Sequence, residues 1–258
     1  MRKTIKAVKS ASAILALFFI SFSYSVAGLL FVSGDTNIVD PLLGTTNGAS
    51  LDTGNQQFFT NILGAGTTVA ILDTSAPFLA QSETVLDTFY SGLGGVSTSI
   101  ISGSVTAADL LAVDLFIAPA PDDAFSVAEL SALGDFLAGG GTLFLLGENN
   151  NADFITANAA INDALLALGS SMSLTPDLFD AGFHQANIAT DPFTTGVTTF
   201  SYAAPSQVAG GTQLFSGSAE QPFLAYEDIY SSVPEPASLA LMGFGLVGLG
   251  FARRKKIV

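Results

Sequence analysis

No lysine or arginine lies between Ser10 and Ala252, so most of this chain must fold without a strong base to pair with its acids. Of the 22 Asp and Glu residues, all but Glu235 lie within residues 28–233. Such an acidic stretch repels phosphate backbones and anionic lipid headgroups, which excludes nucleic acid as a partner. Unpaired carboxylates attract divalent cations, so calcium is a possible ligand, although the same charge also serves solubility. No other cofactor is expected.

The composition indicates one globular domain between two processed ends. The chain has 258 residues, of which 49% are hydrophobic and 12% are charged. That length suits one domain of about 200 residues once the ends are removed. The chain has no cysteine, so disulfides and thiolate chemistry are excluded and packing must stabilise the fold.

Residues 1–27 have the three parts of a secretory signal peptide. A basic start is followed by a predominantly apolar run over residues 11–22 and then by small residues that end at Ala27. We predict cleavage between Ala27 and Gly28. The alternative, an uncleaved anchor, requires about 20 apolar residues to span a bilayer, and this run is shorter.

Residues 233–258 consist of a break, an apolar stretch and a basic end. The break is formed by Val233, Pro234, Glu235 and Pro236, and the basic end by Arg253, Arg254, Lys255 and Lys256. Between them, residues 237–252 carry no charge, which predicts a transmembrane helix of about 24 Å with a cytoplasmic basic flank. Because a bilayer core is about 30 Å thick, spanning requires snorkelling basic side chains or local thinning.

This combination of motif, apolar stretch and basic end resembles the PEP-CTERM sorting signal of Gram-negative bacteria, which is also labelled an ice-binding-protein C-terminal domain. The resemblance implies signal peptidase and exosortase as partners and a transient stay in the inner membrane through the C-terminal helix. It further implies cleavage near residues 234–236 and a final place at the cell surface or in the exopolysaccharide matrix of a biofilm. It implies nothing about ice binding. The alternative is an ordinary C-terminal anchor.

Residues 28–230 alternate short apolar runs with helical patterns, which predicts an open, mostly parallel α/β sheet with helices on both faces, of the flavodoxin-like type. Strands are expected at residues 29–32, 68–72, 96–101, 115–118 and 142–146. Helices are expected around residues 58–63, 85–93, 130–137 and 155–168, the third of them opened by a capping box of Ser126 and Glu129. The remainder is expected to be rich in strands, over residues 197–202, 213–215 and 223–226.

The segment from Phe136 to Asn150, together with residues 191–197, resembles class I glutamine-amidotransferase-like domains, and more closely their non-catalytic relatives in cell-surface and motility proteins. In the enzymes of that family, the turn after the strand at 142–146 carries a nucleophilic cysteine. Here Asn149, or Glu148 in a shifted register, takes that position. The single histidine, His184, is followed by Gln and Ala, so the His-x-Glu pair of the enzymes is also missing. Cysteine-dependent amidotransferase chemistry is therefore excluded.

Polar residues follow several of the predicted strands, at the sheet edge where open α/β sheets bind ligands. Their oxygens and amides suit a cation or a sugar, although Asp and Asn also cap helices and close turns without any ligand. His184 is a possible general base or metal ligand, but a lone histidine is more often structural. The possible ligand or cation site consists of Asp35, Asn37, Glu148, Asn149, Asn150 and His184.

Two functions fit these observations. The first is a non-enzymatic protein of the cell surface or exopolysaccharide matrix whose central domain binds a glycan, a cation or a matrix protein. The alternative is an exopolysaccharide-modifying hydrolase that uses strand-end carboxylates and His184. Clustering of Glu148, Asp35 and His184 in one pocket would favour the hydrolase.

Overall fold

The computed structural model of this chain describes residues 28–39, 51–73, 82–151 and 154–229, which belong to one compact unit. The predicted signal peptide over 1–27 and the sorting segment over 233–258, with its helix at 237–252, lie outside the described residues. Within the described residues, no helix is long and apolar enough to cross a membrane.

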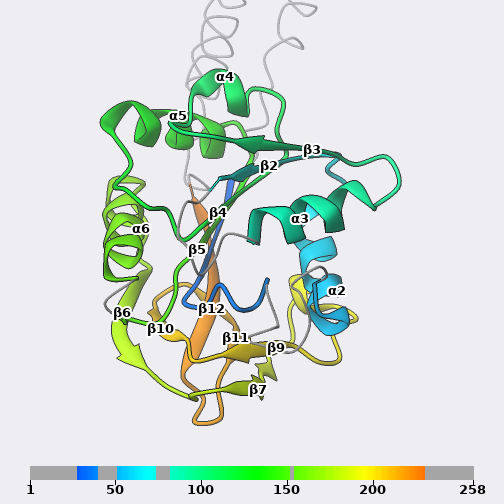
Figure 1. The fold of residues 1–258 in the computed structure, drawn as a ribbon, viewed down its shortest axis with the longest axis vertical. Helices are drawn as coiled ribbons and strands as arrows, with labels where there is room; N and C mark the ends of the chain where they lie inside the picture. The colour runs from blue at the N-terminus through cyan, green and yellow to red at the C-terminus, as the bar shows by residue number, and fades with distance from the viewer. Residues whose placement is uncertain (1–27, 40–50, 74–81, 152–153, 230–258) are drawn as a thin grey trace, which may run out of the picture. The chain divides into compact units, whose positions relative to one another are not determined.

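An eight-stranded sheet forms the centre of the unit, in the order β3-β2-β4-β5-β1-β12-β11-β8 (Figure 1). Its first five strands are parallel, and the last three are antiparallel to their neighbours. The strands are β1 (Gly28–Ser33), β2 (Thr68–Leu72), β3 (Ser97–Ile101), β4 (Leu115–Pro119), β5 (Thr142–Leu146), β8 (Asn187–Ile188), β11 (Thr212–Ser216) and β12 (Pro222–Ile229). The expected mixed α/β architecture with a mostly parallel sheet is confirmed.

The place of β1 differs from the flavodoxin-like order 2-1-3-4-5. There the first strand lies near one edge, whereas here β1 lies between β5 and β12 in the middle of the sheet. Strands β3, β2, β4 and β5 occupy the positions of flavodoxin strands 2, 1, 3 and 4. Strand β1 occupies the position of flavodoxin strand 5. The apolar run of β1 predicts burial but carries no information about its neighbours, so the sequence could not reveal this placement.

Helices cover both faces of the parallel part of the sheet (Figure 1). One core contains the inner sides of α5 and α6 with Leu30 and Val32 of β1, and the other contains those of α2 and α3 with Phe31. Because successive strand residues point to opposite faces, β1 contributes to both cores. The helices are α2 (Thr53–Leu63), α3 (Ser82–Ser91), α4 (Ala107–Leu110), α5 (Val127–Ala138) and α6 (Ile155–Ala167).

The capping box expected at the start of α5 is present. The Ser126 amide donates to Glu129 Oε2 at 2.8 Å, and the Glu129 amide donates to Ser126 Oγ at 3.3 Å. These bonds satisfy two amides that have no partner within the helix and so define where α5 begins.

The strand-rich part after α6 divides into more pieces than the sequence predicts. Besides β8, β11 and β12 of the main sheet, it forms two separate antiparallel pairs, β6 (Ser173–Leu178) with β10 (Ser206–Ala209) and β7 (Phe183–Gln185) with β9 (Ser201–Ala203). The strand expected over 197–202 was wrong in its start, because β9 begins at Ser201. Before it, Pro192–Thr194 forms a 3-10 helix, as the fixed φ of proline at its first position favours.

Phe31 on β1 is the aromatic centre of the second core. Its side chain is fully buried, and its ring centroid lies 6.2 Å from that of Phe58, 5.9 Å from Phe144, 4.9 Å from Phe193 and 5.4 Å from Tyr226. These rings come from a helix, two further strands and the 3-10 helix, so Phe31 joins elements that are distant in sequence.

We expect Phe31→Ala to lower the free energy of unfolding by about 3–5 kcal/mol, because it removes these contacts and leaves a cavity. Urea denaturation followed by circular dichroism measures the change. Phe183→Ala is the matched control: this side chain is 46% exposed, and its loss should cost less than about 1 kcal/mol. Similar losses for the two variants would contradict the importance of the aromatic centre.

Candidate functional site

The ends of β1 and β5 bring several of the predicted site residues together. The two strands are parallel neighbours, with Ser33 opposite Leu146, so the residues that follow them leave the sheet at the same edge. Asp35 and Asn37 follow β1, and Glu148 follows β5. Asn37 Nδ2 lies 2.8 Å from Asp35 Oδ1 and 3.2 Å from Glu148 Oε2, and so donates to both carboxylates.

Both carboxylates accept hydrogen bonds from several donors of this chain. Asp35 Oδ1 also accepts from the Asn37 amide at 2.8 Å, and its Oδ2 accepts from the Ala203 amide at 2.7 Å. Glu148 Oε2 accepts from the hydroxyl and amide of Thr36, while its Oε1 accepts from the Asn149 amide at 2.9 Å and the Asn149 side chain at 2.6 Å. Asn150, which is half-buried, makes none of these hydrogen bonds.

The network is buried, and no Lys or Arg balances it. Asp35 is 0% exposed and Glu148 is 1% exposed. Burial, followed by the negative charge of Glu148, raises the pKa of Asp35 well above its usual range. Burial also raises the pKa of Glu148, although hydrogen bonds from Thr36 and Asn149 oppose the effect. Because two like charges this close cannot both be desolvated cheaply, protonation of the pair is favoured more than that of two free carboxyl groups.

The backbone around Glu148 extends the network to α6 and β10. The Glu148 amide donates to Asn158 Oδ1 at 3.0 Å, and its carbonyl accepts from Asn158 Nδ2 at 2.7 Å and from Ser206 Oγ at 2.8 Å. Nearby, the Ser206 amide donates to the Gly34 carbonyl at 2.8 Å. A Cβ at Gly34 would lie 2.0 Å from the Ser206 carbonyl oxygen, so this close approach requires glycine.

This geometry determines what the carboxylates can do. Their oxygens point at N–H and O–H donors, whereas calcium requires six to eight oxygen ligands free of such donors. Among the described residues, no group of three or more His, Asp or Glu side chains is placed to hold a metal ion. In the structure, Asp35, Asn37, Glu148 and Asn149 therefore connect the strand ends to the segments that cover them.

His184 lies apart from this network, on β7. Its ring centroid is 5.7 Å from that of Tyr202 on β9, and its Nε2 lies 3.3 Å from the Ala181 carbonyl oxygen. Of the predicted site residues, the structure thus brings together four and places His184 elsewhere.

A second cluster near His184 was not predicted from the sequence. Asp180 accepts hydrogen bonds from the Tyr202 hydroxyl, from the Ser218 amide at 2.7 Å and from Ser218 Oγ at 2.5 Å. Although partial burial opposes it, these bonds lower the pKa of Asp180. Asp180 has a left-handed backbone with φ +47°, which is unusual outside glycine. These hydrogen bonds connect the turn between β11 and β12 to the loop before β7. No sequence motif predicts this cluster.

The buried pair should make the domain less stable as the pH rises. A raised folded-state pKa means that the folded protein binds protons more tightly than the unfolded chain, whose Asp and Glu groups titrate near pH 4. The stabilisation is therefore fully present below about pH 4 and is lost as the pH rises through the folded-state pKa values. We expect the free energy of unfolding to fall as the pH rises above about 4, and urea denaturation at a series of pH values measures it.

Asp35→Asn should flatten this dependence, because it removes one of the two titrating groups, and Glu148→Gln should do the same. Asp163→Asn, on the exposed side of α6, is the control with the same change of charge and should retain the wild-type slope. A wild-type slope in both network variants would show that other groups cause the pH dependence.

Carboxyl groups whose pKa is lowered in the folded protein reduce the free energy of unfolding as the pH falls, which is opposite to the effect of the buried pair. Hydrogen bonds from Thr106 lower the pKa of Asp109, and hydrogen bonds from serines lower those of Glu129 and Glu227 against partial burial. Their contribution is present above about pH 4 and is lost as the pH falls through the folded-state values. The two effects together place the maximum of stability in mildly acidic solution.

Comparison with known proteins identifies the C-terminal segment. Residues 232–256 match the model of the PEP-CTERM protein-sorting motif. No curated protein matches this chain. This chain is similar to a solved structure titled "mmIFT52 N-terminal domain". The alignment covers 59% of this chain and 81% of the other, with 17% sequence identity and a TM-score of 0.44. The resemblance of the central domain to class I glutamine-amidotransferase-like domains is not supported by these comparisons. The sorting motif indicates that this is an exported protein processed by exosortase and destined for the cell surface.

Proposed function

We propose that this chain is a non-enzymatic binding or structural protein of the cell surface or exopolysaccharide matrix. The observation that carries the proposal is the PEP-CTERM match over residues 232–256. A protein that is processed by exosortase during export acts outside the cytoplasm, where an acidic, cysteine-free domain remains soluble and does not depend on redox conditions.

The proposed route has two processing steps. Signal peptidase removes residues 1–27 after Ala27, and the uncharged residues 237–252 then hold the chain in the inner membrane with the basic end in the cytoplasm. Exosortase cleaves near residues 234–236 and releases the domain or transfers it to the matrix.

The strand-end residues support a role without catalysis. A hydrolase of the alternative kind requires two carboxylates that reach the substrate. Asp35 and Glu148 are buried, and they accept hydrogen bonds from this chain's own amides and hydroxyls. His184 is engaged with Ala181 and Tyr202 and takes no part in their hydrogen-bond network. No observation therefore favours the hydrolase over the binding role.

The test is expression of the full chain in an exosortase-positive host and in the same host without exosortase. In the first host, we expect intact-mass spectrometry to show cleavage after Ala27 and near residues 234–236, with the protein in the surface or matrix fraction. In the second host, the C-terminus should remain and the protein should stay in the inner membrane.

Replacement of Pro234, Glu235 and Pro236 by alanine should reproduce the second result in the exosortase-positive host. Pro176→Ala, at an exposed position of β6, is the control and should be processed normally. An intact C-terminus of the wild-type protein in both hosts would make this a tail-anchored protein and overturn the proposed sorting route.

A further inference from the structure

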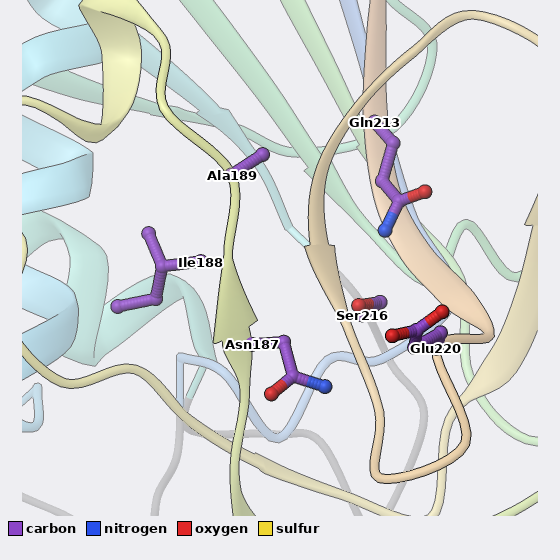
Figure 2. A pocket seen from close by; sticks show the side chains of 6 residues that line it. All are labelled: Asn187, Ile188, Ala189, Gln213, Ser216 and Glu220. Carbon is purple, nitrogen blue, oxygen red and sulfur yellow. The ribbon is translucent and has the colours of Figure 1, made fainter.

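A hollow of about 280 Å³ lies on the antiparallel side of the sheet, between β8 and the hairpin of β11 and β12. Figure 2 shows Asn187 and Ala189 on one side, across from Gln213, Ser216 and Glu220, while the side chain of Ile188 points the other way. This alternation follows from the extended backbone at β8. The residues that line the hollow are Asn187, Ile188, Ala189, Gln213, Ser216 and Glu220.

Most of the polar side-chain groups of the hollow are free, in contrast to those of the buried network. Within the described part of the chain, the side chains of Gln213, Ser216 and Glu220 form no hydrogen bond. Asn187 uses only its Nδ2, which donates to the Gly217 carbonyl at 2.7 Å, so its Oδ1 remains available. Ser216 is 3% exposed as a residue and lines the hollow. The hollow thus offers unused donors and acceptors to a ligand.

The turn that carries Glu220 is held in place before any ligand arrives. The Gly217 amide donates to the Gln221 carbonyl at 2.9 Å, and the Glu220 amide donates to the Gly217 carbonyl at 3.1 Å. Asp180 holds the same turn from the other side through Ser218. Glu220 has a φ of +61°, a strained conformation for a residue with a side chain. Strain of this kind is concentrated at binding sites, and a rigid turn reduces the entropy lost on binding.

We infer that this hollow binds one neutral sugar residue of a glycan, through hydrogen bonds from sugar hydroxyls to Glu220 and from the amide and hydroxyl groups of Gln213, Ser216 and Asn187. Sugar hydroxyls both donate and accept, which matches a mixture of amides, a hydroxyl and a carboxylate. A volume of about 280 Å³ lies just below the usual range of ligand pockets, which limits the ligand to about one ring. The open shape allows the rest of a polysaccharide to continue into solvent.

The charges of the hollow argue against anions and against calcium as its ligand. Glu220 repels anions, and no Lys or Arg lies between Ser10 and Ala252 to attract them. A single carboxylate falls short of the several that a calcium site normally provides. This inference rests on the proposed binding role, and it specifies the ligand class and the place where the ligand binds.

The test is saturation-transfer-difference NMR of the protein as purified from the exosortase-positive host, with glucose, galactose, mannose and N-acetylglucosamine as separate probes. We expect at least one of these sugars to bind with an affinity of the order of millimolar, since the hollow has no aromatic platform. Glucuronate, which differs from glucose by a carboxylate, should bind more weakly than glucose.

Glu220→Gln should weaken binding about fivefold, because hydrogen bonds to a charged acceptor are stronger than those to an amide. Gln213→Ala should weaken it several-fold, and Asp163→Asn on α6 is the control that should leave it unchanged. Circular dichroism establishes that each variant is folded. Unchanged binding in both hollow variants, or no binding of any of the four sugars, would overturn the inference.

Two further outcomes separate this inference from its alternatives. Calcium chloride alone, followed through the backbone amide resonances of residues 213–220, should cause no saturable shift. A saturable shift would identify a cation site instead and overturn the sugar site. The sorting experiment is independent: normal exosortase processing without sugar binding would refute only the sugar site, whereas sugar binding without processing would refute only the sorting route.

Discussion

The hydrogen bonds accepted by Asp35 and Glu148 hold together the part of this domain where the sheet meets its cover. The two carboxylates lie at the ends of adjacent parallel strands, and Ala203 and Ser206 bring β9 and β10 to the same place. Asn158 adds α6. Because all these partners are neutral, the network depends on N–H and O–H donors aimed at the carboxylates, and no ion pair contributes to it. A buried polar network of this kind is stable only when each group is satisfied.

The absence of Lys and Arg from residues 28–233 explains why the network takes this form. In most proteins, a buried carboxylate is paired with a basic side chain. This domain replaces the basic partner with asparagine, threonine and backbone amides, as Asn37 shows by donating to both carboxylates. Elsewhere, Asp180 is satisfied by Tyr202 and Ser218, and Glu227 by Ser170 and Ser171. The pattern fits a protein that keeps a uniformly acidic surface after export.

The contrast between satisfied and free polar groups also separates structural residues from candidate binding residues. Strand-end carboxylates attract attention in a sequence because ligands often bind at that edge of a sheet. Here the cover of β9 and β10 occupies the edge, and the available groups lie instead beside β8, where Gln213 and Glu220 face the hollow. The proposed binding surface therefore lies at the antiparallel strands β8 and β11, and not at the ends of the parallel strands where the sequence predicted it.

The sequence by itself determined the sorting motif, the α/β class, the five parallel strands and the capping box of Ser126 and Glu129, because each depends on residues close together in the chain. It also placed Asp35 and Glu148 at strand ends. Only the tertiary structure decided that β1 lies between β5 and β12, that the carboxylates are covered, and that Asp180 meets Ser218. These features depend on pairing between segments far apart in sequence, and an apolar run or a polar turn carries no record of which distant segment it will meet.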